Sequence, residues 1–324
     1  MTSPMSLPLP MIPPNIAQLT GPLIFGGLMN AFLFGVLTCQ VYMYHASFPL
    51  DAKYIKCLVY AVYIIDLSAT AMVTADMYHW FGVGFGNMLF VNDVYLSAFD
   101  TPMCGAILAS IVQCFYCYRL LKLNHRTTPI CALVILIALA TVTAGVYGAI
   151  VGHIAKTFSA AASKTLPAVY IVYVGSAVAD VLIAATMTTL LLFSSQSHQR
   201  SHYIIKRIIN LTVETNAASS FLAILTVILL VAVPNTNSFT CPSMFLGKIY
   251  SNSLLLLLNN RNFLIGGSLH IPSSNASSTV NPVQRPVYYL NKPSPHAGNT
   301  ESIALDHLDS SASTSTIQKA METV

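Results

Sequence analysis

Seven separate runs of apolar residues constrain this chain more than any other feature of its sequence. A bilayer core about 30 Å thick is crossed by about 20 apolar residues in a helix that rises 1.5 Å per residue. Only 8% of the residues are charged, which is too few to cover a soluble protein of this size. The sequence therefore predicts an all-α, polytopic membrane protein with a seven-transmembrane-helix bundle. The runs are Thr20–Tyr44, Lys56–Met77, Phe99–Tyr118, Pro129–Val151, Pro167–Phe193, Ile209–Val233 and Cys241–Leu258.

Three regions follow from this pattern. Residues 1–19 form a short segment before the first run, and residues 20–261 contain the seven helices. Residues 262–324 are rich in Ser and Thr and poor in apolar residues. Such a segment buries too little apolar surface to offset the entropy lost on ordering. We therefore expect residues 262–324 to form a disordered tail.

The distribution of Lys and Arg predicts the orientation, because cytosolic loops carry an excess of basic residues. The first, third and fifth loops and the end of the last run carry most of them. The segments on the other side carry only Lys156 and Lys164. We therefore expect the N-terminus outside the cytosol, the tail in the cytosol, and a multi-pass protein of the plasma membrane. The basic residues of the cytosolic side are Lys53, Lys56, Arg119, Lys122, Arg126, Arg200, Lys206, Arg207 and Arg261.

Three short motifs carry a resemblance to a known family. The first follows the first run, the second ends the third run, and the third lies in the seventh run. They read Gly35-Val36 with Gln40-x-Tyr42-x-Tyr44 and Phe48-Pro49-x-Asp51, then Val112-Gln113-x-Phe115-Tyr116-x-x-Arg119, then Gly247-Lys248-Ile249-Tyr250-Ser251-Asn252-Ser253-Leu254 with Leu258-Asn259-Asn260-Arg261. With these motifs the chain resembles fungal integral membrane proteins that share a domain of unknown function. The resemblance covers about residues 20–261 and implies a seven-helix membrane architecture and a fungal origin, but no activity.

Two acidic residues lie near the middle of predicted helices, Asp66 in the second and Asp180 in the fifth. An ionisable group at the centre of a membrane helix costs about 2.5–3.5 kcal/mol on insertion scales, so it needs a partner or a purpose. The two carboxyl groups could line a polar cavity, bind a cation or relay protons. Alternatively, each is hydrogen-bonded between packed helices.

Lys248 and Asn252 begin a polar stripe on the seventh predicted helix, which must face the bundle. A lysine in a seventh helix suggests a retinal Schiff base. Against this, Lys248 lies near one end of the run and the only tryptophan, Trp80, falls in a predicted loop. We expect instead an ion pair of Lys248 with Asp100 or Asp76, or a lysine that reaches the membrane interface. No cofactor is expected.

Two cysteines fall on the predicted outer side, Cys104 at the start of the third helix and Cys241 at the start of the seventh. Disulfides persist in such an oxidising environment. The sequence therefore suggests a Cys104–Cys241 disulfide. The alternative is two free thiols that lie too far apart, because a disulfide needs Cα atoms within about 7 Å.

Three functions remain open. The leading hypothesis is a receptor-like protein of the lipid bilayer, with no enzymatic activity, that binds a small ligand from outside. The sequence identifies no cytosolic partner for the tail. The alternative is a transporter or proton-coupled carrier that uses Asp66 and Asp180. An intramembrane metal hydrolase ranks last, because the histidines lie in loops or at helix ends. The modest net charge of +4 gives no reason to expect nucleic-acid binding.

Overall fold

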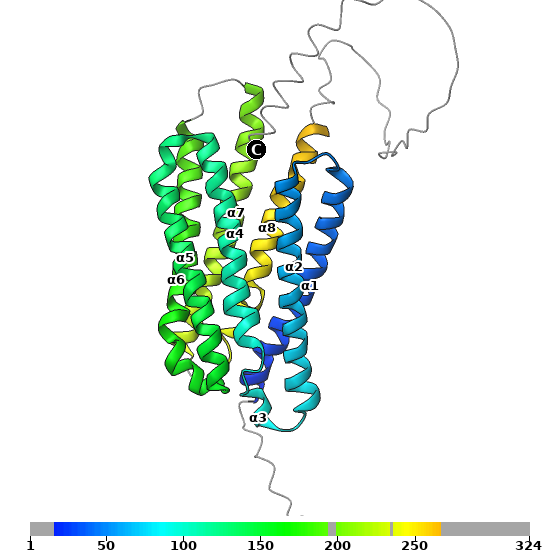
Figure 1. The fold of residues 1–324 in the computed structure, drawn as a ribbon, viewed down its shortest axis with the longest axis vertical. Coiled ribbons are helices and arrows are strands. Elements are labelled where there is room, and N and C mark those ends of the chain that lie inside the picture. The colour runs from blue at the N-terminus through cyan, green and yellow to red at the C-terminus, as the bar shows by residue number, and fades with distance from the viewer. Residues whose placement is uncertain (1–15, 194–198, 234–235, 267–324) are drawn as a thin grey trace, which may run out of the picture. The chain divides into compact units, whose positions relative to one another are not determined.

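A computed structural model describes residues 16–193, 199–233 and 236–266 (Figure 1). The chain divides into two units, Met1–Leu264 and Ile265–Val324, and the helical bundle belongs to the first. The expectations for residues 1–15 and for the tail from residue 267 onward lie outside the described residues. The described part is all-α, with eight α-helices and no strand: α1 Ile16–Ser47, α2 Lys53–Tyr78, α3 Met88–Val91, α4 Cys104–Leu123, α5 Thr128–Ala155, α6 Phe158–Phe193, α7 Gln199–Ala232 and α8 Thr240–Gly266.

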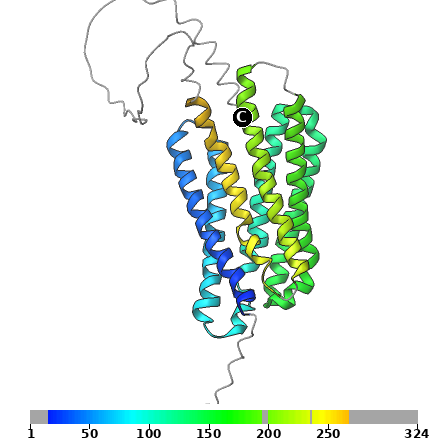
Figure 2. The same cartoon turned by 180° about the vertical axis from the view of Figure 1, so that it is seen from behind.

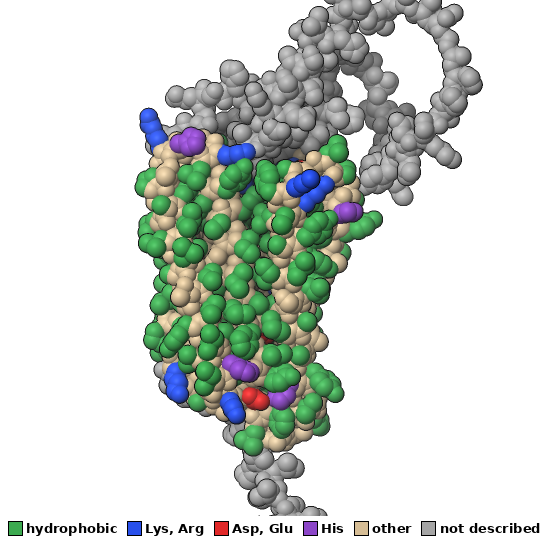
Figure 3. Space-filling model, viewed as in Figure 1, with side chains coloured by type: hydrophobic (Ala, Val, Ile, Leu, Met, Phe, Trp, Pro, Cys, Tyr) green, Lys and Arg blue, Asp and Glu red, His purple; other side chains and the backbone are tan. Residues whose placement is uncertain are grey.

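Among the described residues, six helical segments are long and apolar enough to cross a membrane: Ile16–Ser47, Lys53–Val83, Phe99–Leu123, His125–Ala155, Lys164–Leu190 and Ile209–Ala232. They indicate a multi-pass integral membrane protein. Each falls on one of the predicted runs, and most extend beyond it by several residues. On the face seen in Figure 3, apolar side chains are spread along the length of the bundle, while the visible Lys and Arg side chains lie near its two ends.

The seventh long helix, α8, is not among these six spans, although its 27 residues exceed the length needed to cross a bilayer. Its composition is more polar than that of the six spans, and its position among other helices allows this. From residue 242 to residue 261 only Leu256 is classed as exposed. An enclosed helix presents little surface to lipid, so its polar side chains can be satisfied by neighbouring helices. Figure 2 shows α8 beside α1.

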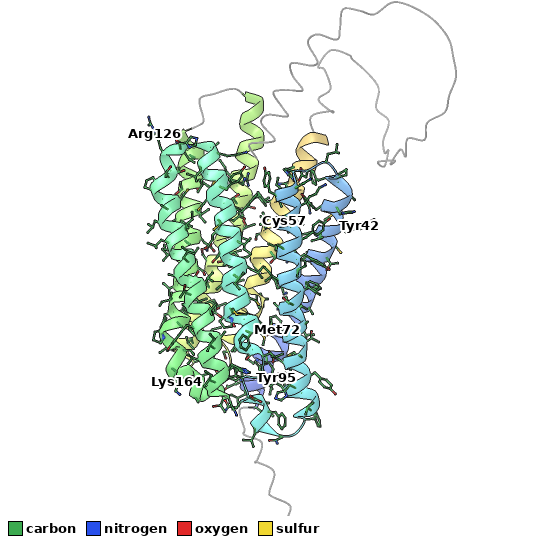
Figure 4. The ribbon with its side chains drawn as sticks, in the orientation of Figure 1. Tyr42, Cys57, Met72, Tyr95, Arg126 and Lys164 are labelled. Atoms are coloured by element: carbon green, nitrogen blue, oxygen red, sulfur yellow. The ribbon has the colours of Figure 1, made fainter. Side chains whose placement is uncertain are left out.

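The bundle has two ends, which Figure 4 marks with labelled residues. Lys164 and Tyr95 lie at the end that carries α3, called here the α3 end, and Arg126 lies at the opposite end, called the Arg126 end (Figure 4). The α1–α2 and α4–α5 connections lie at the Arg126 end, and the α2–α4 and α5–α6 connections lie at the α3 end (Figure 1).

The α2–α4 connection is a folded cap rather than an open loop. A π-helical turn, His79–Val83, extends α2, and a second one, Phe99–Met103, precedes α4. Trp80, predicted to lie in a loop, is in the first turn with only 1% of its surface exposed. Its indole Nε1 donates a hydrogen bond of 2.9 Å to the carbonyl oxygen of Asp93. Gly86 has a φ of +78°, a conformation that glycine adopts at little cost.

Candidate functional site

Lys248 and Asp66 form an ion pair in the bundle interior, between α8 and α2. The Lys248 Nζ lies 2.8 Å from Asp66 Oδ1, and their side chains are 2% and 0% exposed. The ammonium group also donates to the Asp66 carbonyl oxygen at 2.7 Å and to Thr70 Oγ1 at 2.6 Å. An ammonium group has three protons to donate, so all of its donors are used. The pair also lies near an aromatic face, because Nζ is 5.3 Å from the centre of the Phe34 ring.

The partner of Lys248 differs from the one predicted. The sequence suggested Asp100 or Asp76, or a side chain that reaches the interface. Both acids are buried elsewhere, with exposures of 4% and 0%. Asp76 Oδ1 accepts the backbone N–H of Leu96 at 2.9 Å, and Asp100 Oδ1 accepts the Thr101 hydroxyl at 2.7 Å. The Asp76 contact joins the α2–α4 cap to α2, and the Asp100 contact lies within the cap.

Asp180 is the centre of a second polar cluster, and its contacts come from three other helices. Its side chain is fully buried. Oδ1 accepts Gln113 Nε2 from α4 at 3.0 Å, and Oδ2 accepts the Tyr250 hydroxyl from α8 at 2.7 Å. Oδ2 also accepts the hydroxyl of Ser219 from α7. Asp180 therefore joins α4, α6, α7 and α8 through three uncharged donors.

The two carboxyl groups do not share a site. Asp66 contacts a cation on α8, whereas Asp180 contacts only neutral donors among the described residues. The clusters are linked through α8, because Lys248 and Tyr250 are two positions apart on it. The sequence placed both acids inside the bundle, but it missed Gln113, Ser219 and Tyr250 as partners. The resemblance motifs contain two of these three residues.

Asn252 belongs to a series of amide contacts that joins α8 to α1. Its Nδ2 donates to the Leu33 carbonyl oxygen at 3.1 Å and to the Lys248 carbonyl oxygen at 2.8 Å. Asn259 Nδ2 donates to the Gln40 carbonyl oxygen at 2.9 Å. In the opposite direction, Asn30 of α1 donates to the carbonyl oxygen of Met244. The polar stripe predicted on this helix thus contacts the backbone of α1 as well as other side chains.

A third cluster closes the Arg126 end. Arg261 forms a bidentate contact with Asp51, with Nη1 3.3 Å from Oδ1 and Nη2 bonded to Oδ2. The Tyr44 hydroxyl donates to the same Oδ2 at 2.8 Å, and the guanidinium carbon lies 4.5 Å from the centre of the Phe48 ring. In the sequence, Tyr44, Phe48 and Asp51 stood out only as parts of motifs, and Arg261 also as one of the basic residues of the cytosolic side. The geometry assigns them one task, which is to join the end of α8 to α1 and to the α1–α2 connection.

A cavity with a volume of about 120 Å³ lies at the α3 end. Its walls are mostly apolar and come from the α2–α4 cap with its second π-helical turn, from α5, α6 and α7, and from the start of α8. None of the described residues that line it has a charged side chain. The residues that line it include Ser97, Thr101, Gly148, Phe158, Thr165, Ala168, Tyr173, Thr240 and Ser243.

A small void of about 10 Å³ continues from this cavity toward Asp180. Both spaces are lined by Thr101, Tyr173 and Ser243. The small void also reaches Tyr250, whose hydroxyl donates to Asp180. The cavity therefore shares a wall with the Asp180 cluster, although neither Asp66 nor Asp180 lines the cavity itself.

The predicted Cys104–Cys241 disulfide is wrong for this structure, in which both residues are free thiols. Residue 105 packs against Gly247 of α8. Cys241 precedes Gly247 by six positions, which is about 9 Å along a helix. It faces α1, because its Cα would lie 3.2 Å from a Cβ added at Gly26. The two thiols thus lie at different depths and face different neighbours.

The described residues contain no group of three or more His, Cys, Asp or Glu side chains placed to hold a metal ion. Comparison with known proteins gives one match. Residues 176–263 match the model of a family of unknown function, DUF6534. This segment contains Asp180, Ser219, Lys248, Tyr250 and Arg261, so it includes a residue of each of the three polar clusters. No curated protein and no solved structure matches the chain.

Proposed function

We propose that this membrane protein is receptor-like and binds a small molecule in the cavity at the α3 end. The observation that carries the proposal is the cavity's position beside the Asp180 cluster. A molecule that contacts Tyr173 or Ser243 lies within one side chain of the Tyr250–Asp180 hydrogen bond. That bond belongs to a cluster that joins four helices, so ligand binding can alter how they pack against one another.

The proposed topology has seven membrane spans, the α3 end outside, the Arg126 end in the cytosol, and the plasma membrane as location. The excess of Lys and Arg near the Arg126 end supports this orientation. The burial of α8 supports its inclusion as a seventh span despite its polar residues. With this topology the cavity lies in the outer half of the bundle. The tail then lies in the cytosol, where its many Ser and Thr residues are accessible for phosphorylation. A fungal origin, which the resemblance implies, remains part of the proposal.

A proton-coupled carrier is the competing function. Such a carrier needs an ionisable group that binds its ion from an accessible cavity. Asp66 is already paired with Lys248, and Asp180 accepts three hydrogen bonds in the packed interior. This arrangement favours the receptor-like function over transport.

The test compares two readouts of the full-length protein in lipid nanodiscs or liposomes. One is a conformational change at the Arg126 end on ligand binding, and the other is uptake across the membrane. A fluorescent label is attached at Arg126→Cys, on an exposed residue of the Arg126 end. The background lacks the exposed thiols of Cys39, Cys57 and Cys114. We use methylcyclohexane as the probe because the cavity is mostly apolar. If the protein is receptor-like, binding of the probe should change the fluorescence emission of the label.

Two cavity-filling variants, Gly148→Leu and Ala168→Leu, should abolish that change. A Cβ added at Gly148 would meet only Ala168, at 3.8 Å, so the larger side chain enters the cavity. Gly35→Leu is the matched control, because Gly35 is exposed on α1 and has open space at its Cβ position. The same response in all variants would refute the proposal. Uptake driven by a proton gradient, and lost in Asp180→Asn, would establish the carrier instead.

A further inference from the structure

We infer that Arg119 of α4 and Asn216 of α7 together bind the phosphate group of an anionic phospholipid near the Arg126 end. This site is independent of the proposed function, because it lies at the opposite end of the bundle from the cavity. The inference rests on two buried donors that lack an acceptor, on their position on two opposed helices, and on the depth of Arg119 in the bundle.

Arg119 is a buried cation that has no described counter-charge. The residue is 7% exposed, and its Nη1 atom is enclosed without a hydrogen-bond partner among the described residues. The carboxylate of Asp66 is paired with Lys248. The carboxylate of Asp51 is paired with Arg261. A buried charge without a partner is strongly destabilising, so we expect a group from outside the described part of the chain to neutralise Arg119.

A second buried donor lies on α7. Asn216 is 2% exposed, and its Nδ2 atom also lacks a partner among the described residues. The hydroxyl oxygens of Tyr116 on α4 and Thr215 on α7 lie 3.5 Å apart and set the register of the two helices. Arg119 follows Tyr116 by one turn, and Asn216 is next to Thr215.

The directions of the two helices bring these donors to a similar depth. Figure 1 shows that α4 ends and α7 begins at the Arg126 end. Side chains of a helix tilt toward its N-terminus. The side chain of Arg119 therefore tilts toward the α3 end, and that of Asn216 tilts toward the Arg126 end. One ligand between α4 and α7 can thus accept hydrogen bonds from both.

The donor chemistry specifies an anion with several oxygen atoms. A guanidinium group presents parallel N–H donors that match two oxygens of a phosphate or carboxylate group. The amide of Asn216 adds a further N–H donor. The described neighbour of Arg119 on its own helix is the Phe115 ring, 5.9 Å from the guanidinium carbon, which offers no oxygen. A terminal phosphate group has three strong acceptor oxygens, enough to bind both side chains.

The depth of Arg119 favours a lipid as the source of the phosphate. Arg119 precedes the end of α4 at Leu123 by four residues, about 6 Å along the helix. The ends of membrane helices lie at the level of the lipid headgroups. Lys122 adds positive charge one turn further along α4. Basic sites between membrane helices are suited to phosphorylated headgroups.

The site is linked to the Asp180 cluster through both helices. Gln113 precedes Arg119 by six positions on α4, about 9 Å. Ser219 follows Asn216 by three positions on α7. Both Gln113 and Ser219 donate to Asp180. A phosphate group that joins α4 to α7 therefore also restrains two of the three described donors to Asp180.

The test measures thermal unfolding of the full-length protein in a neutral detergent, with increasing concentrations of dioctanoyl phosphatidic acid. Dioctanoyl phosphatidylcholine has the same acyl chains without a net charge. Inorganic phosphate and acetate, at equal ionic strength, represent soluble anions. A ligand that binds only the folded protein raises the melting temperature. We expect a saturable rise with phosphatidic acid and little change with phosphatidylcholine or acetate.

Arg119→Met provides the decisive variant. Without added lipid it should be at least as stable as the unmodified protein, because it removes an unpaired buried charge. Its apparent affinity for phosphatidic acid should fall by at least about tenfold, because a charged donor is lost. Arg126→Met is the matched control, because Arg126 is an exposed arginine at the same end, and it should retain the response. Asn216→Leu keeps the guanidinium group and should weaken binding severalfold, so it tests the site even if Arg119→Met does not fold.

The other outcomes separate the sources and can overturn the inference. Inorganic phosphate that acts through Arg119 as strongly as phosphatidic acid would support the phosphate site and assign it to a soluble ligand. An equal loss in Arg126→Met would show general charge attraction and overturn the site, as would stabilisation by acetate alone. If no anion stabilises the protein and Arg119→Met melts lower without ligand, Arg119 is a structural residue and the inference fails. None of these outcomes affects ligand binding in the cavity at the α3 end.

Discussion

Removing one partner of the Lys248–Asp66 pair should destabilise the protein far more than removing both. The two variants are Lys248→Met and Asp66→Leu, which keep side chains of similar size. In Lys248→Met, the Asp66 carboxylate remains buried without its cation. In Asp66→Leu, the ammonium retains only the residue-66 carbonyl and Thr70.

The magnitude follows from the burial of the pair. Both side chains are at most 2% exposed, so water cannot replace the lost partner. Breaking such a pair costs about 3–5 kcal/mol, whereas replacing both members with apolar residues is often neutral or stabilising. A change of 1 kcal/mol shifts the melting temperature by about 2–4 °C for a domain of 150–250 residues. Each single variant should therefore melt about 6–20 °C lower, and the double variant should recover most of that loss.

The assay is thermal unfolding of the purified protein in one detergent, with all four forms of the double-mutant cycle measured together. The control cycle pairs Lys248→Met with Gly35→Leu, whose side chain faces outward from α1 and does not meet Lys248. The stability effects of two substitutions that lie far apart add within about 0.5 kcal/mol. If the changes in unfolding free energy caused by Lys248→Met and Asp66→Leu also add within this limit, the two charges do not interact and the reasoning is refuted.

Three further predictions test the other parts of the molecule. For topology, a reporter fused after Val324 should be cytosolic and a tag before Met1 accessible from outside; a tag protected from protease in intact cells would refute the orientation. Asp180→Asn should lower the melting temperature by several degrees, because its amide turns a donor toward Gln113, Ser219 or Tyr250; an unchanged melting temperature would show that the carboxylate is dispensable. Arg261→Leu should also be destabilising, since it leaves the Asp51 carboxylate without its cation. It should increase proteolysis in the α1–α2 connection. Unchanged proteolysis would argue that the Arg261–Asp51 contact does not hold this connection in place.

The sequence predicted the helices well because lipid-facing segments must be apolar along their whole length. Each of the six apolar spans falls on a predicted run. The polar stripe of the last run was also informative, since a polar residue in a membrane helix must find a partner. Lys248 and Asn252 indeed face other helices. Hydropathy reflects the surface that a helix presents to lipid, so the largely enclosed α8 had the weakest hydropathy signal.

The partner of Lys248 could not be deduced, because it depends on how far neighbouring helices extend at the α3 end. The sequence suggested depth by counting from the end of each apolar run. By that count Lys248 lies near one end and Asp66 near the middle. The chain of α2 continues past Tyr78 into the π-helical turn that ends at Val83. Because this extension carries α2 beyond the start of α8, Asp66 lies level with Lys248.

The contacts of α8 also determine which part of the bundle can respond to a ligand. Asn30, Asn252 and Asn259 bond to backbone carbonyls across the α1–α8 interface. Sliding α8 by one turn, about 5.4 Å, would break all of these bonds and separate Lys248 from Asp66. The described residues show no such bonds in the α5–α6 wall of the cavity at Gly148 and Ala168, where even a Cβ added at Gly148 would lie 3.8 Å from the Ala168 side chain. For the proposed receptor-like function, we therefore expect a ligand to displace α5 and α6 at lower cost than α8. Because Asp180 lies on α6, such a displacement acts directly on its bonds to α4, α7 and α8.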